Sequence, residues 1–267
     1  MAQPPPPRRR RPSADSSDSD SDAASPGPLP ASVALSAQLF PGQARSLSGV
    51  ALRAYCLGLV SSTSLLLLIL LSPSSPLWRA PFFALALSAF HFLEFWATAR
   101  RNTLAATTDS FLLTANWPAY AVAHAAAFLE CVLVNAFRPD RRWAGSTVVV
   151  VVGLVLVLVG QAVRSAAMLR AGASFNHQVQ LARAESHVLV TGGVYAWLRH
   201  PSYFGFFYWG LGTQLVCGNV VCFFVYAVVL WTFFSRRVRV EEAKLVEFFG
   251  DDYVQYRKRV GTGMPFI

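Results

Sequence analysis

Long apolar runs, separated by short segments that contain Arg and Pro, constrain this chain more than any other feature. A helix needs roughly 20 apolar residues to cross a bilayer, and several runs approach that length, one of them centred on Val148–Val159. The 267 residues are 54% hydrophobic and 14% charged, with a mean hydropathy of +0.41. We therefore predict an all-α, polytopic integral membrane protein rather than a soluble globule.

The runs and their breakers predict about six transmembrane helices. Four full spans are expected at about 48–71, 80–97, 117–137 and 146–168. Two shorter apolar stretches, at about 202–216 and 219–234, are interrupted by Cys217-Gly218-Asn219. Each is short for a full crossing, so they predict a tilted C-terminal helical hairpin. A last, amphipathic helix is expected at about 236–260.

Five segments follow from this pattern. They are a disordered tail (1–45), four transmembrane helices (46–168), a polar connector (169–201), a membrane hairpin (202–234) and a charged C-terminal region (235–267). The Pro, Arg and Ser/Asp clusters of the tail cannot build a core. The connector and the C-terminal region hold much of the Arg and Lys, so the positive-inside rule places both in the cytosol.

The net charge of +9 does not indicate a nucleic-acid partner. The Arg residues flank apolar runs, as membrane orientation requires, and we find no soluble domain that combines basic and aromatic residues. Four cysteines lie in or beside predicted spans, and none forms a CxxC pair, so we expect neither a metal site nor a disulfide framework. They are Cys56, Cys131, Cys217 and Cys222.

The segment Arg199–Tyr203 joins the polar connector to an apolar, aromatic stretch. Pro201 suits the first turn of a helix, and the free N–H groups of such a turn bind anions. Ser202 and Tyr203 add hydroxyls, and His200 adds a further donor. The segment is therefore either a site for a carboxylate or phosphate, or an interfacial cap whose aromatic residues face lipid headgroups.

Two further patterns also allow a functional and a structural interpretation. Arg237 and Glu241 are four residues apart on one predicted helix face, which they share with Leu245. They either face ligands of opposite charge or form a mutual salt bridge. The β-prone run 187–190, with Gly192-Gly193 and Tyr195 after it, either presents backbone groups to a flat ring or is a simple loop.

Ionisable residues inside the predicted spans are functional candidates by default. The second span contains His91 and Glu94, and the third contains His124 and Glu130. The alternative is that these residues pair with one another across spans.

Together these motifs resemble those of the isoprenylcysteine carboxyl methyltransferases of the endoplasmic reticulum. The resemblance covers about 88–267 and is most specific in the last hundred residues. The sequence departs from the family at Val238-Arg239-Val240, where members often carry further acidic residues. The matching motifs are His91–Phe95, Asp109–Leu113, Ser174–His177, Gln180, Leu189–Thr191, Gly193–Trp197, Arg199–Tyr203, Phe207–Trp209, Gly212–Gln214, Glu241-Glu242, Phe248–Gly250, Tyr253, Tyr256–Val260, Thr262-Gly263 and Pro265–Ile267.

The resemblance implies a multi-pass enzyme of the endoplasmic reticulum membrane whose active site faces the cytosol. The methyl donor would be S-adenosylmethionine, without a metal, and the acceptor a C-terminal S-prenylated cysteine of processed CaaX proteins such as small GTPases. It makes 169–201 the cofactor-binding connector and 235–267 the catalytic region, with Arg237 on the substrate carboxylate and Glu241 on the donor. The residues it assigns to the donor are Gln180, His187, Val188, Leu189, Val190, Tyr195, His200, Pro201, Ser202, Tyr203 and Glu241.

Within this scheme we expect Tyr195 and residues 187–190 to hold the adenine, and His200 with the Pro201 helix start to hold the donor's own carboxylate. We expect the prenyl chain between spans, near the second to fourth. A phospholipid N-methyltransferase or an NADPH-dependent sterol reductase remains an alternative, because both kinds of enzyme can show a similar Arg-His-Pro-x-Tyr stretch. A transporter or structural membrane protein is the non-enzymatic alternative.

Overall fold

The computed structural model describes residues 36–72, 75–115, 118–137, 146–177, 180 and 187–267. The chain divides into two units, Met1–Ala37 and Gln38–Ile267, and the second contains all the helices discussed below. The tail predicted to be disordered lies mostly outside the described residues. Those residues form α-helices and short 3-10 turns without a strand, which confirms the all-α class. The α-helices are α2 (Leu47–Leu71), α3 (Arg79–Arg101), α4 (Leu112–Ala115), α5 (Ala119–Phe137), α7 (Thr147–Ala171), α8 (Pro201–Cys217), α9 (Val221–Phe249) and α10 (Asp251–Arg259).

Five of these helices are long and apolar enough to cross a membrane: α2, α3, α5, α7 and α9. The shorter α8 has 17 residues, most of which are buried against its neighbours. The five long helices and α8 together correspond to the expected six membrane helices. In α2 only Ser64 is buried, so this helix presents nearly its whole apolar surface outward, as a lipid-facing helix does.

The C-terminal hairpin differs from the prediction in its second arm. The sequence predicted an apolar stretch ending near 234 and a separate helix at 236–260, and these boundaries are wrong, because α9 runs unbroken from Val221 to Phe249. A change from apolar to charged residues does not end a helix, whereas a glycine with a positive, non-helical φ does. Gly250, with φ 55°, ends α9, and α10 follows it directly.

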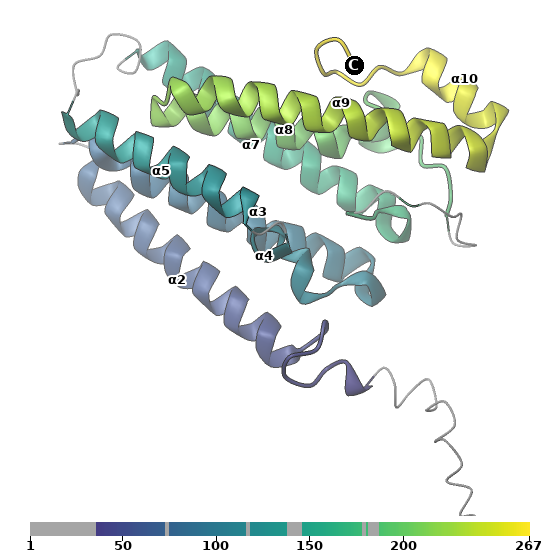
Figure 1. The fold of residues 1–267 in the computed structure, drawn as a ribbon, viewed down its shortest axis with the longest axis horizontal. Coiled ribbons are helices and arrows are strands. Elements are labelled where there is room, and N and C mark those ends of the chain that lie inside the picture. Colours follow the sequence, from purple (N-terminus) through teal and green to yellow (C-terminus); the bar gives the residue numbers. More distant parts are fainter. Residues whose placement is uncertain (1–35, 73–74, 116–117, 138–145, 178–179, 181–186) are drawn as a thin grey trace, which may run out of the picture. The chain divides into compact units, whose positions relative to one another are not determined.

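Close helix contacts fix α8 between its neighbours, and two glycine pairs bring α7 and α8 together. A Cβ added to Gly160 would lie 2.6 Å from the carbonyl oxygen of Gly205, and one added to Gly153 would lie 3.0 Å from that of Gly212. Such small residues allow membrane helices to approach closely. Because Gly153 faces Gly212 while Gly160 faces Gly205, α7 and α8 are antiparallel. Figure 1 shows α7, α8 and α9 side by side.

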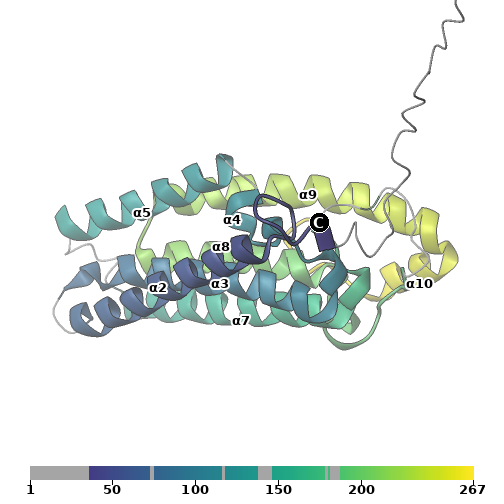
Figure 2. The same cartoon turned by 90° about the horizontal axis from the view of Figure 1, so that it is seen from below.

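The direction of the helices gathers the polar segments at one end of the bundle. Figure 2 shows α5 and α9 along one side, α2, α3 and α7 along the other, and α8 between them. The C-terminal ends of α3 and α7 lie beside the start of α8 and the charged part of α9. Basic residues accumulate there, with Arg100 and Arg101 in the last turn of α3 and Arg170 in that of α7.

Candidate functional site

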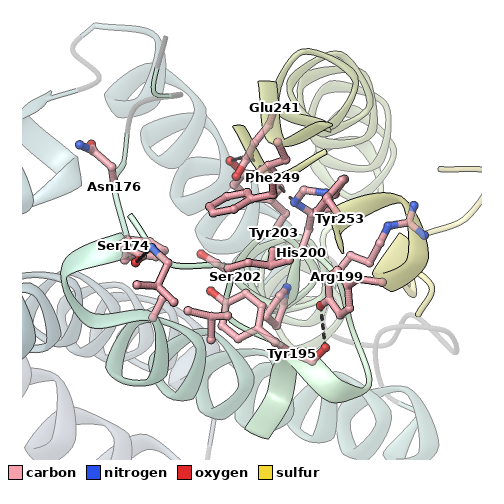
Figure 3. A pocket seen from close by; sticks show the side chains of 18 residues that line it. Ser174, Asn176, Tyr195, Arg199, His200, Ser202, Tyr203, Glu241, Phe249 and Tyr253 are labelled. Carbon is pink, nitrogen blue, oxygen red and sulfur yellow. Dashed lines mark hydrogen bonds and ion pairs between the residues drawn. The ribbon is translucent and has the colours of Figure 1, made fainter. Parts of the chain in front are cut away.

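A small cavity lies where the start of α8 meets the charged part of α9 (Figure 3). Its volume is about 120 Å³. In Figure 3, Glu241 and Phe249 reach it from one side and Tyr195 from the other. The lining residues come from four parts of the chain and are Ala171, Ser174–Asn176, Val188–Val190, Tyr195, Arg199–Tyr203, Glu241, Leu245, Phe249, Tyr253 and Tyr256.

The structure brings most of the sequence-predicted donor residues to this one cavity. Val188, Leu189, Val190, Tyr195, His200, Pro201, Ser202, Tyr203 and Glu241 all line it. Gln180 and His187 flank residues 181–186, which lie outside the described residues, and neither is among the described lining residues. The run 187–190 forms no strand, so the cavity wall there is extended loop.

The junction folds as its sequence predicted. His200 is the N-cap residue of α8 and Pro201 occupies the first turn, where its missing N–H leaves no helical hydrogen bond unmade. The rings of His200 and Tyr203 are stacked, with centroids 5.5 Å apart and an interplanar angle of 6°. The cavity therefore has a helix start and two aromatic rings on one wall.

Two tyrosines outside the membrane spans, Tyr195 and Tyr256, also line the cavity. The hydroxyl of Tyr256 donates to the Tyr195 carbonyl at 2.6 Å. Burial raises the pKa of Tyr256 to about 12, although the nearby Arg199 opposes the shift. Burial, and then the charge of Glu241, also raise the pKa of Tyr195 well above its usual value. Both phenols are thus neutral near pH 7 and offer rings and hydroxyl donors rather than a base.

The two acidic neighbours on α9 have different environments. Glu241 lines the cavity with Leu245, its neighbour on the predicted helix face, and with Phe249 one turn further along. Arg237, the third residue of that predicted face, is not among the lining residues. Glu242 points to the junction instead, where it accepts from Arg199 Nε at 2.9 Å and lies 3.2 Å from His200 Nε2. Arg199 also donates to the Val260 carbonyl at 2.6 Å. Glu242 and Arg199 therefore join α8, α9 and the segment after α10.

Arg237 and Glu241 do not form the direct salt bridge that the spacing allowed. The Tyr203 hydroxyl lies between them, because it accepts from Arg237 Nε at 2.7 Å and donates to the Glu241 carboxylate. A second Arg237 donor, Nη2, bonds the His177 carbonyl. In the described part of the chain, Arg237 has no carboxylate partner. Among the described residues, Tyr203 and the His177 carbonyl hold this positive charge in place and no carboxylate pairs with it directly.

Arg237 faces a second cavity, which opens on the outer side of α9. This groove has a volume of about 570 Å³. The Arg237 guanidinium lies 5.4 Å from the Tyr203 ring centroid and 5.9 Å from that of Phe233. The groove is mainly apolar, and its lining residues are Val228, Val229, Thr232, Phe233, Arg236, Arg237 and Val240. Tyr203 thus separates a polar cavity from an apolar groove.

Sequence reasoning missed one polar contact beneath this site. Arg164 of α7 binds the Glu94 carboxylate of α3 and also donates to Ser202 of α8. Glu94 was noted as an intramembrane ionisable residue, and an Arg inside the next apolar run was the available signal for its partner. Two other candidates have structural partners: Glu130 accepts three backbone N–H groups at the start of α9, and His124 lies 2.8 Å from the Tyr226 hydroxyl. His91 is fully buried between aromatic rings, and neither of its ring nitrogens has a hydrogen-bond partner among the described residues.

The described residues contain no group of three or more His, Cys, Asp or Glu side chains placed to hold a metal ion. The charged and polar groups that these residues bring to the site are the Glu241 carboxylate, the Arg237 guanidinium, the His200 imidazole, neutral phenols and the start of α8.

Comparison with known proteins relates this arrangement to one family. Residues 151–247 match the isoprenylcysteine carboxyl methyltransferase (ICMT) family. The protein-S-isoprenylcysteine O-methyltransferase of Mus musculus is 43% identical over 222 residues, which cover 82% of this chain and 75% of that protein. The corresponding enzyme of Saccharomyces cerevisiae is 46% identical over 189 residues, covering 69% and 79% of the two chains.

A solved structure shows the same fold. It is described as the eukaryotic intramembrane Ras methyltransferase ICMT, and it superposes with a TM-score of 0.77 at 35% sequence identity. The match covers 88% of this chain and 82% of the other.

Proposed function

This chain belongs to the isoprenylcysteine carboxyl methyltransferase family, and on that premise we propose that it methylates the α-carboxylate of C-terminal S-prenylated cysteine with S-adenosylmethionine as donor. The observation that carries the proposal is the position of Arg237. It lies between the polar cavity and the apolar groove, bound to Tyr203 and His177 and without a carboxylate partner in the described residues. A substrate with a carboxylate next to a long apolar chain would match these two features together.

The lining of the polar cavity suits the donor. Glu241 would attract its cationic groups, and the Tyr195 and Tyr203 rings would contact a sulfonium or a purine favourably. The start of α8 at Pro201, with His200, would receive its carboxylate. Ligand pockets usually measure about 300–1,000 Å³, so the cavity of about 120 Å³ must widen when the donor binds.

The chemistry requires little from the protein beyond positioning and charge. When bound, S-adenosylmethionine supplies an electrophilic methyl group, and its transfer to a carboxylate oxygen leaves a neutral ester and a neutral thioether. An α-carboxyl has a reference pKa of about 3.3–3.7, so the acceptor is already ionised at neutral pH and no general base is needed. Arg237 orients it, and Tyr203 fixes the distance between Arg237 and Glu241. Excluding water favours a step that consumes two opposite charges.

The groove beside Arg237 offers the prenyl chain a surface. The sequence suggested a path near the second to fourth spans, but the groove runs along α9, through Val228, Val229 and Phe233. Each CH₂ buried there contributes about 0.8 kcal/mol. We therefore place the chain against α9, with its carboxylate end at Arg237. Val229→Trp should fill the groove and raise KM for the prenylated substrate without changing donor affinity.

We also propose that the enzyme lies in the endoplasmic reticulum membrane with this end in the cytosol, where it meets prenylated CaaX proteins such as small GTPases. The Arg residues at the ends of α3 and α7 support this orientation, because cytoplasmic ends of membrane helices are rich in Arg and Lys.

The direct test is transfer of labelled methyl to N-acetyl farnesylcysteine by the detergent-solubilised protein. The wild type should form the methyl ester, and Arg237→Ala should lose turnover while it still binds the donor. The matched variant is Arg239→Ala, at an exposed residue of the same helix that lines neither the cavity nor the groove, and it should retain activity. Tyr195→Ala and His200→Ala should weaken donor binding in a titration. Full activity of Arg237→Ala, or methyl transfer to phosphatidylethanolamine instead, would refute the proposal.

A further inference from the structure

A closed set of polar contacts lies beneath Arg237, inside the helix bundle. Glu94 of α3 and Arg164 of α7 have only 1% and 5% of their surfaces exposed. The guanidinium binds both carboxylate oxygens, through Nε to Oε1 and through Nη2 to Oε2 at 2.7 Å. Such a two-point contact fixes orientation as well as distance.

The same guanidinium also holds the start of α8. Arg164 Nη1 donates to the Ser202 carbonyl and to the Ser202 hydroxyl, each at 3.0 Å. Ser202 directly precedes Tyr203, whose hydroxyl accepts from Arg237 Nε. A displacement of Arg164 would therefore move Ser202 and, with it, Tyr203, whose hydroxyl holds Arg237 Nε.

A second arm leads from Glu94 to Arg237 through His177. His177 Nδ1 lies 3.8 Å from Glu94 Oε2, and its Nε2 lies 3.4 Å from the Thr98 hydroxyl of α3. The His177 carbonyl accepts from Arg237 Nη2. One Arg237 donor thus bonds Tyr203, which follows Ser202, and the other bonds the carbonyl of His177, whose ring packs against Glu94 beyond hydrogen-bond distance.

We propose that the buried Glu94–Arg164 ion pair is a positioning device that holds the substrate-orienting Arg237 in register with the first turn of α8. Neither residue lines the donor cavity or the groove, so both act through Ser202 and His177 rather than on the reacting atoms. Taking two charges out of water is costly, and two hydrophobic residues of similar size would hold the helices together as well. What a hydrophobic pair could not supply is the pair of hydrogen bonds from Arg164 Nη1 to the carbonyl and the hydroxyl of Ser202. The inference rests on the proposed function, because it assigns Arg237 to the substrate carboxylate.

The test is the double variant Glu94→Gln/Arg164→Met, which removes both charges and leaves neither one unpaired. Its thermal midpoint in detergent and its discrimination between a carboxylate and an amide are both measured. Discrimination is the inhibition constant of farnesylcysteine amide divided by KM for N-acetyl farnesylcysteine. We expect a midpoint close to that of the wild type but a discrimination ratio lowered roughly tenfold or more, since a misplacement of about 1 Å can cost up to 10²-fold.

Two further variants complete the experiment. Arg164→Lys keeps a positive charge opposite Glu94, but a lysine cannot bond Glu94 and Ser202 with the same geometry. This variant should therefore lower the discrimination ratio even if the double variant does not fold. The matched control is Arg79→Met/Asn135→Leu, which removes another buried polar pair, joined at 3.0 Å, at the other end of α3. It should leave the ratio of the folded protein unchanged.

The results separate this inference from the proposed function. If the wild type transfers no methyl to the prenylcysteine, the proposed function fails. If the wild type is active and both Arg164 variants keep its discrimination ratio, the pair is merely structural and the positioning role is wrong.

Discussion

Replacing Gly160 with alanine tests how closely α7 and α8 must approach. The new Cβ would lie 2.6 Å from the Gly205 carbonyl oxygen and 2.7 Å from the Trp209 backbone nitrogen. Ordinary contact at such a Cβ begins near 3.4 Å. Because both clashing atoms belong to the backbone of α8, a side-chain rotation cannot relieve them. The two helices would have to separate locally by about 0.8 Å, the difference between 3.4 and 2.6 Å.

Overpacking of this kind costs typically about 1–3 kcal/mol, and the higher helix propensity of alanine returns at most about 1 kcal/mol. We expect Gly160→Ala to be destabilised by up to about 2 kcal/mol, with a thermal midpoint lowered by about 2–4 °C for each kcal/mol. Gly205 is one turn from Pro201, so the displacement also reaches the polar cavity, which we propose binds the donor. Donor affinity should therefore fall together with stability.

The assay is thermal unfolding in detergent, followed by titration with the donor. Gly58→Ala in α2 is the matched control, since an added Cβ there meets nothing within 4 Å; its midpoint should equal or exceed that of the wild type. A Gly160→Ala protein that unfolds with its wild-type midpoint and binds the donor normally would refute the close packing of α7 on α8.

Three other changes test separate contacts. Tyr203→Phe removes the hydroxyl between Arg237 and Glu241, and the loss of such hydrogen bonds to charged groups costs about 1–3 kcal/mol. The value of kcat/KM for the prenylcysteine should therefore fall about tenfold while the protein stays folded. An unchanged kcat/KM would show that this hydroxyl does not position Arg237. Glu130→Ala leaves three N–H groups at the start of α9 without their acceptor and should lower the unfolding free energy by about 1–3 kcal/mol without altering KM. Burial lowers the pKa of His177 from 6.5 to about 4. Between pH 6.5 and 4 the unfolded chain therefore binds a proton at His177 that the folded chain does not, and the free energy of unfolding falls by at most about 1.4 kcal/mol per pH unit as the pH drops. His177→Asn should make the free energy of unfolding less dependent on pH in this range. An equally steep loss in the variant would show that His177 is not the group responsible.

The membrane helices were predictable from sequence because their signal is local. Each of the first four apolar runs is long enough to identify a span by itself. The end of α9 was not predictable in the same way. The residues after Phe234 become charged, which suggested a boundary, but helix propensity continues through Arg236–Phe249 until Gly250. Hydropathy reports the solvent around a helix, whereas the backbone conformation of a single glycine determines where the helix stops.

Most residues that line the candidate cavity were predicted together from the sequence, but their contacts were not. Spacing placed Arg237 and Glu241 on one face, and a residue four positions further along a helix is rotated by about 40°. From Arg237 to Phe249 the rotation accumulates to about 120°. One helix therefore presents Phe249 to the polar cavity and Arg237 to the apolar groove. Spacing shows that two side chains are neighbours, but it does not show which partner lies between them.

The continuity of α9 and the position of Tyr203 depend on each other. Tyr203 contacts Phe234, in the apolar part of α9, with ring centroids 5.1 Å apart, while its hydroxyl contacts Arg237 and Glu241 in the charged part. A helix that ended near 234 would leave the two charged residues on a separate element with no fixed distance from that ring. Since a single helix carries all three residues, packing of the apolar part on α8 also sets the geometry of the charged part. The membrane-embedded contact and the polar site are thus one rigid unit, which explains how a reaction at the membrane border can be positioned from within the bilayer.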